Sequence, residues 1–147
     1  GMVGGQALDL AAEIAATPLS QSEILEMQAM KTGALLRFAV DAGAMLGRAS
    51  PQQASSLTAY GKALGAAFQI ADDILDAEGD TVALGKRAGK DAARGKATLV
   101  SLLGLEAARQ RCDQLVNEAT LALHKTGLKP ATQTLEQAAR FVAARRN

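Results

Sequence analysis

The sequence predicts an all-α protein with about five helices. Hydrophobic residues make up 48% of the chain but aromatic residues only 3%, and Ala and Leu dominate. Unbranched side chains of this kind lose little rotamer freedom in a helix. Apolar residues also recur at helical spacing through most of the chain. With 147 residues, the chain is long enough for one domain with its own core. We therefore treat residues 1–147 as a single helical segment.

The helical pattern divides into segments that end at recognisable signals. We expect helices at about residues 5–16, 21–47, 51–77, 98–125 and 131–146. The first ends before Pro18, because a residue that precedes proline avoids helical geometry. Ser20 or Ser22 caps the second, and Ser50 caps the third, with a proline in its first turn. A glycine and a proline separate the last two.

The third helix is rich in small residues, including Gly61 and Gly65. A glycine inside a helix costs about 1 kcal/mol against alanine. Such residues are favoured where a neighbouring backbone or a cavity lies close. We therefore expect tight packing around this helix.

A Gly- and Lys-rich segment covers residues 78–97, between the third and fourth predicted helices. It contains Lys86, Lys90 and Lys96 among turn-forming residues. A loop of this length inside a compact domain usually has a function. We predict that it is an active-site loop.

Charge, apolar runs and cysteine content argue against several functional classes of protein. The net charge is +1, so no overall field favours nucleic acid or an anionic membrane. No apolar run reaches the ~18 residues of a membrane span, and we expect no secretory signal. Cys112 is the single cysteine and cannot form an internal disulfide, which fits a reducing compartment. We expect a cytoplasmic protein.

Three carboxylates form the strongest candidate for chemistry. Asp72, Asp73 and Asp76 follow an apolar helical run, and Asp72 and Asp76 lie one turn apart on one face. Repelling carboxylates near the negative end of a helix dipole are unfavourable, and magnesium coordination would offset that cost. The alternative is a solvated acidic face. The spacing alone favours neither.

Other polar residues could complete a diphosphate site. Lys31, Lys86 and Lys96 are candidate phosphate ligands, although each alone is more often a solvated side chain. Gln69 lies three residues before Asp72, on the same side of its helix. Gln6 and Asp9 read more simply as a helix-surface pair.

The combination of motifs resembles the trans-prenyl diphosphate synthase family, in the manner of the bacterial farnesyl diphosphate synthases. The resemblance rests on Gly4-Gly5-Gln6-x-x-Asp9, Lys31-Thr32-Gly33, Phe68-Gln69-x-x-Asp72-Asp73-x-x-Asp76, Leu84-Gly85-Lys86 and Gly95-Lys96. It implies an isoprenoid-synthase-type helical bundle around a cavity, of which this chain is the C-terminal half. Family members are roughly twice as long and carry a first Asp-rich motif that is absent here.

The same resemblance implies a magnesium-dependent condensation of isopentenyl diphosphate with an allylic diphosphate. Three Mg²⁺ ions, with Mn²⁺ as an alternative, would bind the complete site. The implied metal ligands are Asp72, directly, and Asp73 and Asp76, largely through water. The implied diphosphate ligands are Lys31, Lys86 and Lys96.

The resemblance assigns the remaining roles as well. Gln69, Thr32 and the Lys31 carbonyl would stabilise positive charge on carbon, with a helix irregularity at Gly33. Phe68 and Gln6 would contact substrate, although Phe68 could equally be a core aromatic. The carboxy-terminal arginines, Arg145 and Arg146, could close over a diphosphate.

A half-fold would expose apolar helix faces, so we expect a homo-oligomer and no condensation by the chain alone. Two other interpretations stay open. The first is a non-catalytic helical subunit that packs with a partner. The second is a terpene cyclase, although residues 78–80 do not supply the metal motif typical of cyclases.

Overall fold

The computed structural model describes residues 1–17, 19–84 and 98–145. All regular secondary structure within these ranges is helical, which confirms the predicted all-α fold. The elements are α1 (Met2–Glu13), α2 (Gln21–Gln28), the π-helix η1 (Ala29–Gly33), α3 (Ala34–Leu46), α4 (Pro51–Leu84), α5 (Leu99–Leu103), α6 (Leu105–His124) and α7 (Gln133–Ala144).

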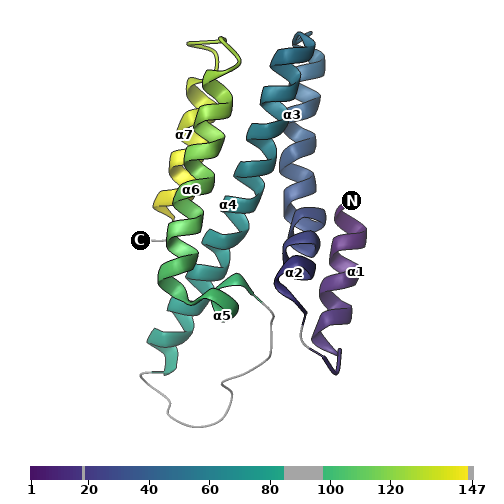
Figure 1. Cartoon of the computed structure of the whole chain (residues 1–147), viewed down its shortest axis with the longest axis vertical. Coiled ribbons are helices and arrows are strands. Elements are labelled where there is room, and N and C mark those ends of the chain that lie inside the picture. The colour runs from purple at the N-terminus through teal and green to yellow at the C-terminus, as the bar shows by residue number, and fades with distance from the viewer. Residues whose placement is uncertain (18, 85–97, 146–147) are drawn as a thin grey trace.

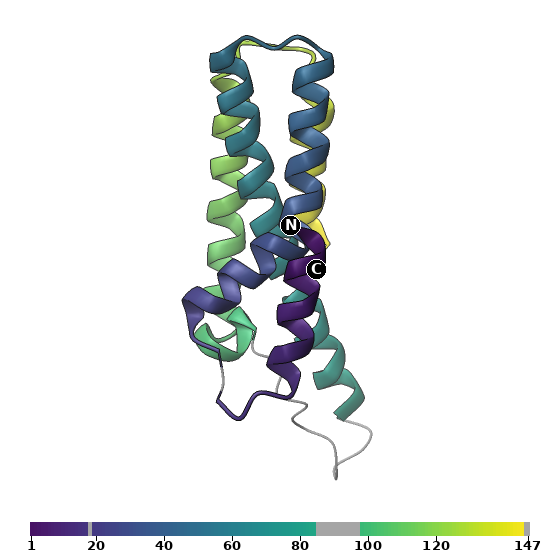
Figure 2. The same cartoon turned by 90° about the vertical axis from the view of Figure 1, so that its right-hand side faces the viewer.

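The long helix α4 is the centre of the fold. It packs against α3 on one side and against α6 and α7 on the other (Figure 1). The α3–α4 turn and the α6–α7 turn lie at the same end of the molecule (Figure 2). Towards the other end, α1 and α2 pack beside η1. Asp9 of α1 and Lys31 of η1 lie in this second half.

The core lies between α4, α6 and α7. It consists of small and branched apolar side chains around Tyr60, which is fully buried. The Tyr60 hydroxyl donates a 2.9 Å hydrogen bond to the backbone carbonyl of Leu135. Burial raises the pKa of Tyr60 to about 12, because the phenolate would lose its hydration. This hydrogen bond ties α7 to α4.

Several predicted helix boundaries differ from the structure. The prediction ends the third helix at residue 77, but α4 continues through Gly79 to Leu84. Glu78 forms an ion pair with Arg109 of α6, which holds this end of α4 against its neighbour. The predicted helix 98–125 is broken at Gly104, whose φ of 83° suits glycine and ends α5. The remaining residues of the predicted loop, 85–97, lie outside the described part of the chain.

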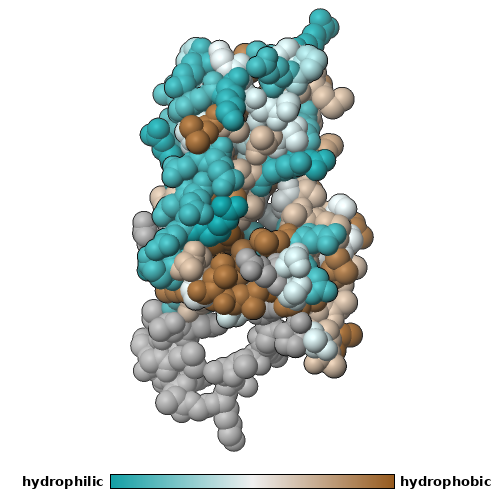
Figure 3. All heavy atoms as spheres, viewed as in Figure 1, coloured by the Kyte–Doolittle hydropathy of each residue, from teal (hydrophilic) through white to brown (hydrophobic). Residues whose placement is uncertain are grey.

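Many large apolar side chains are exposed. In the face seen in Figure 3, apolar residues gather in the lower half, around the place where Figure 1 shows α5. More than half of each of these side chains is exposed: Val3, Leu10, Ile14, Leu35, Phe38, Met45, Leu46, Leu121 and Phe141. Among the described helices, none is both long enough and apolar enough to cross a membrane.

Candidate active site

An ion pair joins the first helix to the π-helix. The Lys31 ammonium binds the Asp9 carboxylate. Asp9 is buried, with its side chain 10% exposed, whereas the Lys31 side chain is 31% exposed. The prediction that Asp9 belongs to a helix-surface pair is therefore wrong. Asp9 faces inward because α1 packs directly on η1. The ammonium retains donors for a further acceptor, since it carries three.

A second buried carboxylate lies next to this pair. Asp73 of α4 is 4% exposed and accepts a 2.8 Å hydrogen bond from the side-chain amide of Gln28. The amide nitrogen of Gln69 lies 3.5 Å from the other oxygen of Asp73. Gln28 is the last residue of α2, directly before η1. Asp73 thus connects α4 to the start of the π-helix.

The two carboxylates share one small polar cavity of about 20 Å³. Its lining comes from five elements or their caps: Asp9, Met27, Gln28, Lys31, Gln69, Asp73 and Thr98. A cavity of this size holds about one water molecule. We call these seven residues the polar cluster. Residues from distant parts of the sequence therefore meet at one point.

The π-helix is held between two glycines. A Cβ atom on Gly5 would lie 2.4 Å from the backbone nitrogen of Lys31, and one on Gly65 would lie 2.9 Å from Cα of Gly33. Both distances are shorter than real Cβ contacts, so only glycine allows α1 and α4 to approach η1 this closely. The irregularity expected at Gly33 is present, because η1 ends there. π-Helical turns often occur at functional sites.

The other two carboxylates are more accessible than Asp73. The Asp72 side chain is 48% exposed and its Oδ1 lies 3.7 Å from the Arg145 guanidinium. The same guanidinium lies over the Phe68 ring, 4.8 Å from its centroid. Asp76 is exposed. Within the described ranges, no group of three acidic, His or Cys side chains could hold a metal ion together.

The structure therefore separates the predicted metal ligands. Asp72 and Asp76 present carboxylates to solvent, whereas Asp73 is turned into the polar cluster. Gln6, Thr32 and Phe68 are half-buried. Lys86, Lys96 and Arg146 lie outside the described residues.

Sequence reasoning missed Gln28 and misassigned Asp9. A signal existed for Gln28, since it lies three residues before Lys31, on the same helix face. For Asp9, the signal was Gly5, which lies one turn earlier on the same face of α1. That face packs against the backbone of η1.

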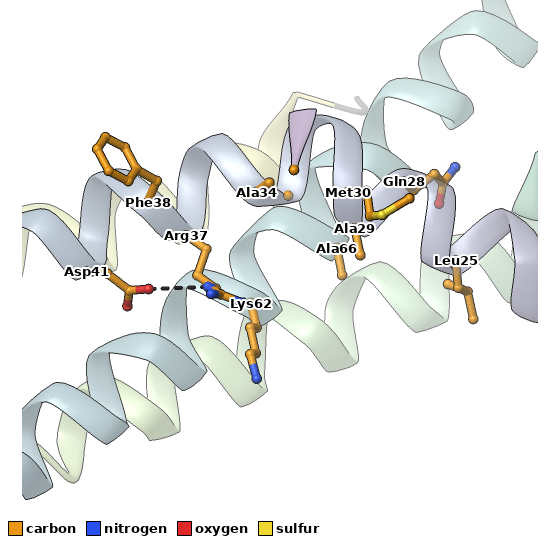
Figure 4. Close-up of a pocket in the computed structure, with 12 residues that line it drawn as sticks. Leu25, Gln28, Ala29, Met30, Ala34, Arg37, Phe38, Asp41, Lys62 and Ala66 are labelled. Carbon is orange, nitrogen blue, oxygen red and sulfur yellow. Dashed lines mark hydrogen bonds and ion pairs between the residues drawn. The ribbon is translucent and has the colours of Figure 1, made fainter. Parts of the chain in front are cut away.

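An open groove of about 460 Å³ adjoins the polar cluster (Figure 4). Gln28, Met30 and Gly33 are among the residues that line it, and α3 and α4 supply further lining residues. Arg37 and Asp41 form a 3.2 Å ion pair along it, and Phe38 also lines it (Figure 4). Most of the residues that line the groove are apolar or small. Such a lining suits the hydrocarbon part of a ligand more than a charged part.

The family model and the known proteins that resemble this chain point to the same family. The model of the polyprenyl synthetase family matches residues 1–134. Farnesyl diphosphate synthase from Escherichia coli is 43% identical over 147 residues, covering 99% of this chain and 48% of that protein. The Bacillus subtilis farnesyl diphosphate synthase is 39% identical over 145 residues, also covering 99% of this chain and 48% of that protein.

Solved structures agree with these matches. The crystal structure of an FPP/GFPP synthase from Zymomonas mobilis superposes with a TM-score of 0.83 at 43% identity, covering 97% of this chain and 45% of that one. A putative farnesyl-diphosphate synthase from Marinomonas gives a TM-score of 0.78 at 33% identity, covering 97% and 46%. The all-α bundle and the polar cluster thus define a helical isoprenoid-synthase fold. The chain belongs to the polyprenyl synthetase family. It spans about half the length of the relatives that it matches.

Proposed function

We propose that this chain forms the C-terminal half of the active site of a prenyltransferase that condenses isopentenyl diphosphate with an allylic diphosphate. One observation carries the proposal. The folded chain brings Asp9, Lys31 and Gln69, which belong to three separate motifs, into one polar cluster beside the accessible Asp72. Cations and metal-binding carboxylates together suit a diphosphate.

The chemistry needs charge of both signs. Breaking an allylic C–O bond places negative charge on the leaving diphosphate and positive charge on carbon. The ammonium of Lys31 stabilises the first, with Lys86 and Lys96 as further candidates. The amide oxygen of Gln69 and the hydroxyl of Thr32 stabilise the second. Phe68 and Gln6 stay candidates for contact with substrate.

Magnesium fits the accessible carboxylates. Mg²⁺ in phosphate sites usually takes one or two carboxylates, and substrate oxygens and waters complete its shell. The Asp72 side chain is 48% exposed and Asp76 is exposed, so both would hold it in this way. When bound, the ion neutralises charge on the diphosphate oxygens. Mn²⁺ has similar ligand preferences and would substitute.

A complementation experiment tests the proposal. The chain is mixed with the N-terminal half of the E. coli farnesyl diphosphate synthase, and incorporation of labelled isopentenyl diphosphate into prenyl product is measured. We expect product from the mixture, none from either half alone, and none when the chain carries Asp72→Ala. Product formation that is unchanged by Asp72→Ala would refute the assignment.

We further propose that the chain self-associates. Exposed apolar side chains directly after α1 and on α3, such as Ile14 at 88% and Leu46 at 86%, are unusual for a monomer. Light scattering should give an oligomer, and a monodisperse monomer would contradict this proposal. A cytoplasmic location stays a proposal that rests on Cys112 being the single cysteine of the sequence, which leaves it no partner for an internal disulfide.

A non-catalytic helical subunit is the alternative. The accessible Asp72 and the Asp9–Lys31 pair argue against it, because a purely structural module has no need of a charged cluster at this point. Loss of all diphosphate binding in the complemented protein would favour the alternative.

A further inference from the structure

We propose that Asp73 is a positioning residue and not a metal ligand. Its buried carboxylate orients the amide of Gln69 and anchors the start of the π-helix that carries Lys31. The catalytic meaning of Gln69 and Lys31 rests on the proposed function above, whereas the contacts of Asp73 do not.

The hydrogen bonds between Asp73 and the two glutamines run in one direction, from the amides to the carboxylate. An ionised carboxylate only accepts hydrogen bonds, so each nearby amide must turn its NH₂ group towards it. Gln28 does so at 2.8 Å and Gln69 at 3.5 Å, on different oxygens of Asp73. The amide oxygen of Gln69 is therefore turned away from Asp73. That oxygen is the atom that would stabilise positive charge on carbon.

The contact with Gln28 acts on the π-helix. Gln28 ends α2 and directly precedes η1, and Lys31 and Thr32 lie within η1. The Asp73–Gln28 hydrogen bond spans 45 residues of sequence and is buried. Gly5 and Gly65 hold the other sides of the same segment. Asp73 thus holds the start of η1 through Gln28, while the two glycines hold its other sides. By holding η1 in place, Asp73 helps to position the Lys31 ammonium.

The surroundings of Asp73 do not suit a magnesium ligand. Mg²⁺ dehydrates reluctantly and keeps several waters. Asp73 is 4% exposed and opens onto a cavity of about 20 Å³, which has room for about one water molecule. Swinging its carboxylate outward to reach a metal would also remove the acceptor of the buried Gln28 amide.

Two variants separate the roles. Asp73→Asn replaces one acceptor oxygen with a donor, so one of the two glutamine amides meets an NH₂ group. Adding Gln28→Glu restores both hydrogen bonds, with the one between positions 28 and 73 reversed. The amide at position 73 then donates to the carboxylate at position 28, and its oxygen still accepts from Gln69. The double variant rebuilds the hydrogen bonds without a carboxylate at position 73. Asp72→Asn is the matched control for an accessible carboxylate.

The first readout is proton exchange of the glutamine side-chain amides, followed by NMR on the full chain. In the wild type, the amides of Gln28 and Gln69 should exchange at least about tenfold more slowly than the exposed Gln110 amide. We expect Asp73→Asn to abolish the protection of Gln69 and the double variant to restore it. Equal exchange of Gln69 and Gln110 in the wild type would overturn the proposal, even if a variant failed to fold.

The second readout is binding of a bisphosphonate with and without Mg²⁺. We expect the double variant to keep the magnesium dependence of the wild type, and Asp72→Asn to lose it. Loss of magnesium dependence in the double variant as well as in Asp72→Asn would make Asp73 a metal ligand and overturn the proposal. If no form binds the bisphosphonate, the chain alone has no preorganised diphosphate site, while the exchange experiment still decides the role of Asp73.

Discussion

The contact between α1 and η1 predicts opposite outcomes for two adjacent glycines. Gly4 and Gly5 both lie inside α1. A Cβ on Gly4 would meet nothing within 4 Å, whereas one on Gly5 would lie 2.4 to 2.8 Å from backbone atoms of Met30 and Lys31. Replacement by Ala gains about 1 kcal/mol of helix propensity at either position. That gain cancels when the two variants are compared.

The difference between the variants therefore measures the clash. Overpacking costs about 1–3 kcal/mol, and the upper end applies here because backbone atoms cannot rotate aside. We expect Gly4→Ala to stabilise α1 by about 1 kcal/mol and Gly5→Ala to destabilise it by about 2 kcal/mol. Asp9, one turn further along α1, would be pulled from Lys31.

Amide hydrogen exchange within α1 is the appropriate assay, because α1 lies at the edge of the bundle and can detach without global unfolding. A difference of about 3 kcal/mol corresponds to protection factors that differ by roughly two orders of magnitude. Equal protection in the two variants would show that α1 does not pack on η1 as described.

Three further predictions concern stability. Tyr60 has a raised pKa, so the phenol stays protonated in the folded state while the unfolded chain ionises from about pH 10. Stability is full below pH 10 and falls by roughly 3 kcal/mol as the pH rises to about 12. Urea titrations should show this loss, and it should be absent from Tyr60→Phe. Gly104→Ala should cost about 1–2 kcal/mol in urea unfolding because of its positive φ, whereas Gly79→Ala, in open space within α4, should gain up to about 1 kcal/mol. Equal effects of these two changes would contradict the break between α5 and α6. Thr98→Ala removes the capping box of α5 and should lower its local exchange protection by about 1 kcal/mol, and unchanged protection would exclude a role for the cap.

The sequence was sufficient to predict helices and motif positions, because both follow from local patterns. The apolar period and the cap residues locate most helices to within a few residues. The end of α4 was beyond this reasoning, since it depends on the ion pair of Glu78 with Arg109 from a distant helix. The break at Gly104 is a backbone conformation that a glycine permits but does not require.

The candidate site shows the same division. The Asp-rich motif was recognisable from its spacing and family resemblance, but three carboxylates in five positions gave no indication of which one is buried. Asp73 points inward because Gln28, 45 residues earlier, lies opposite it. Burial of Asp9 likewise depends on how closely Gly5 lets α1 approach η1. Such tertiary contacts are not visible in a local pattern.

The most direct test of the half-site is a calorimetric titration of this chain with a bisphosphonate, with and without Mg²⁺, repeated with Asp72→Ala. We predict magnesium-dependent binding to the wild type and its loss in Asp72→Ala. Wild-type binding that persists in Asp72→Ala, or no binding under any condition, would contradict a preorganised half-site at Asp72.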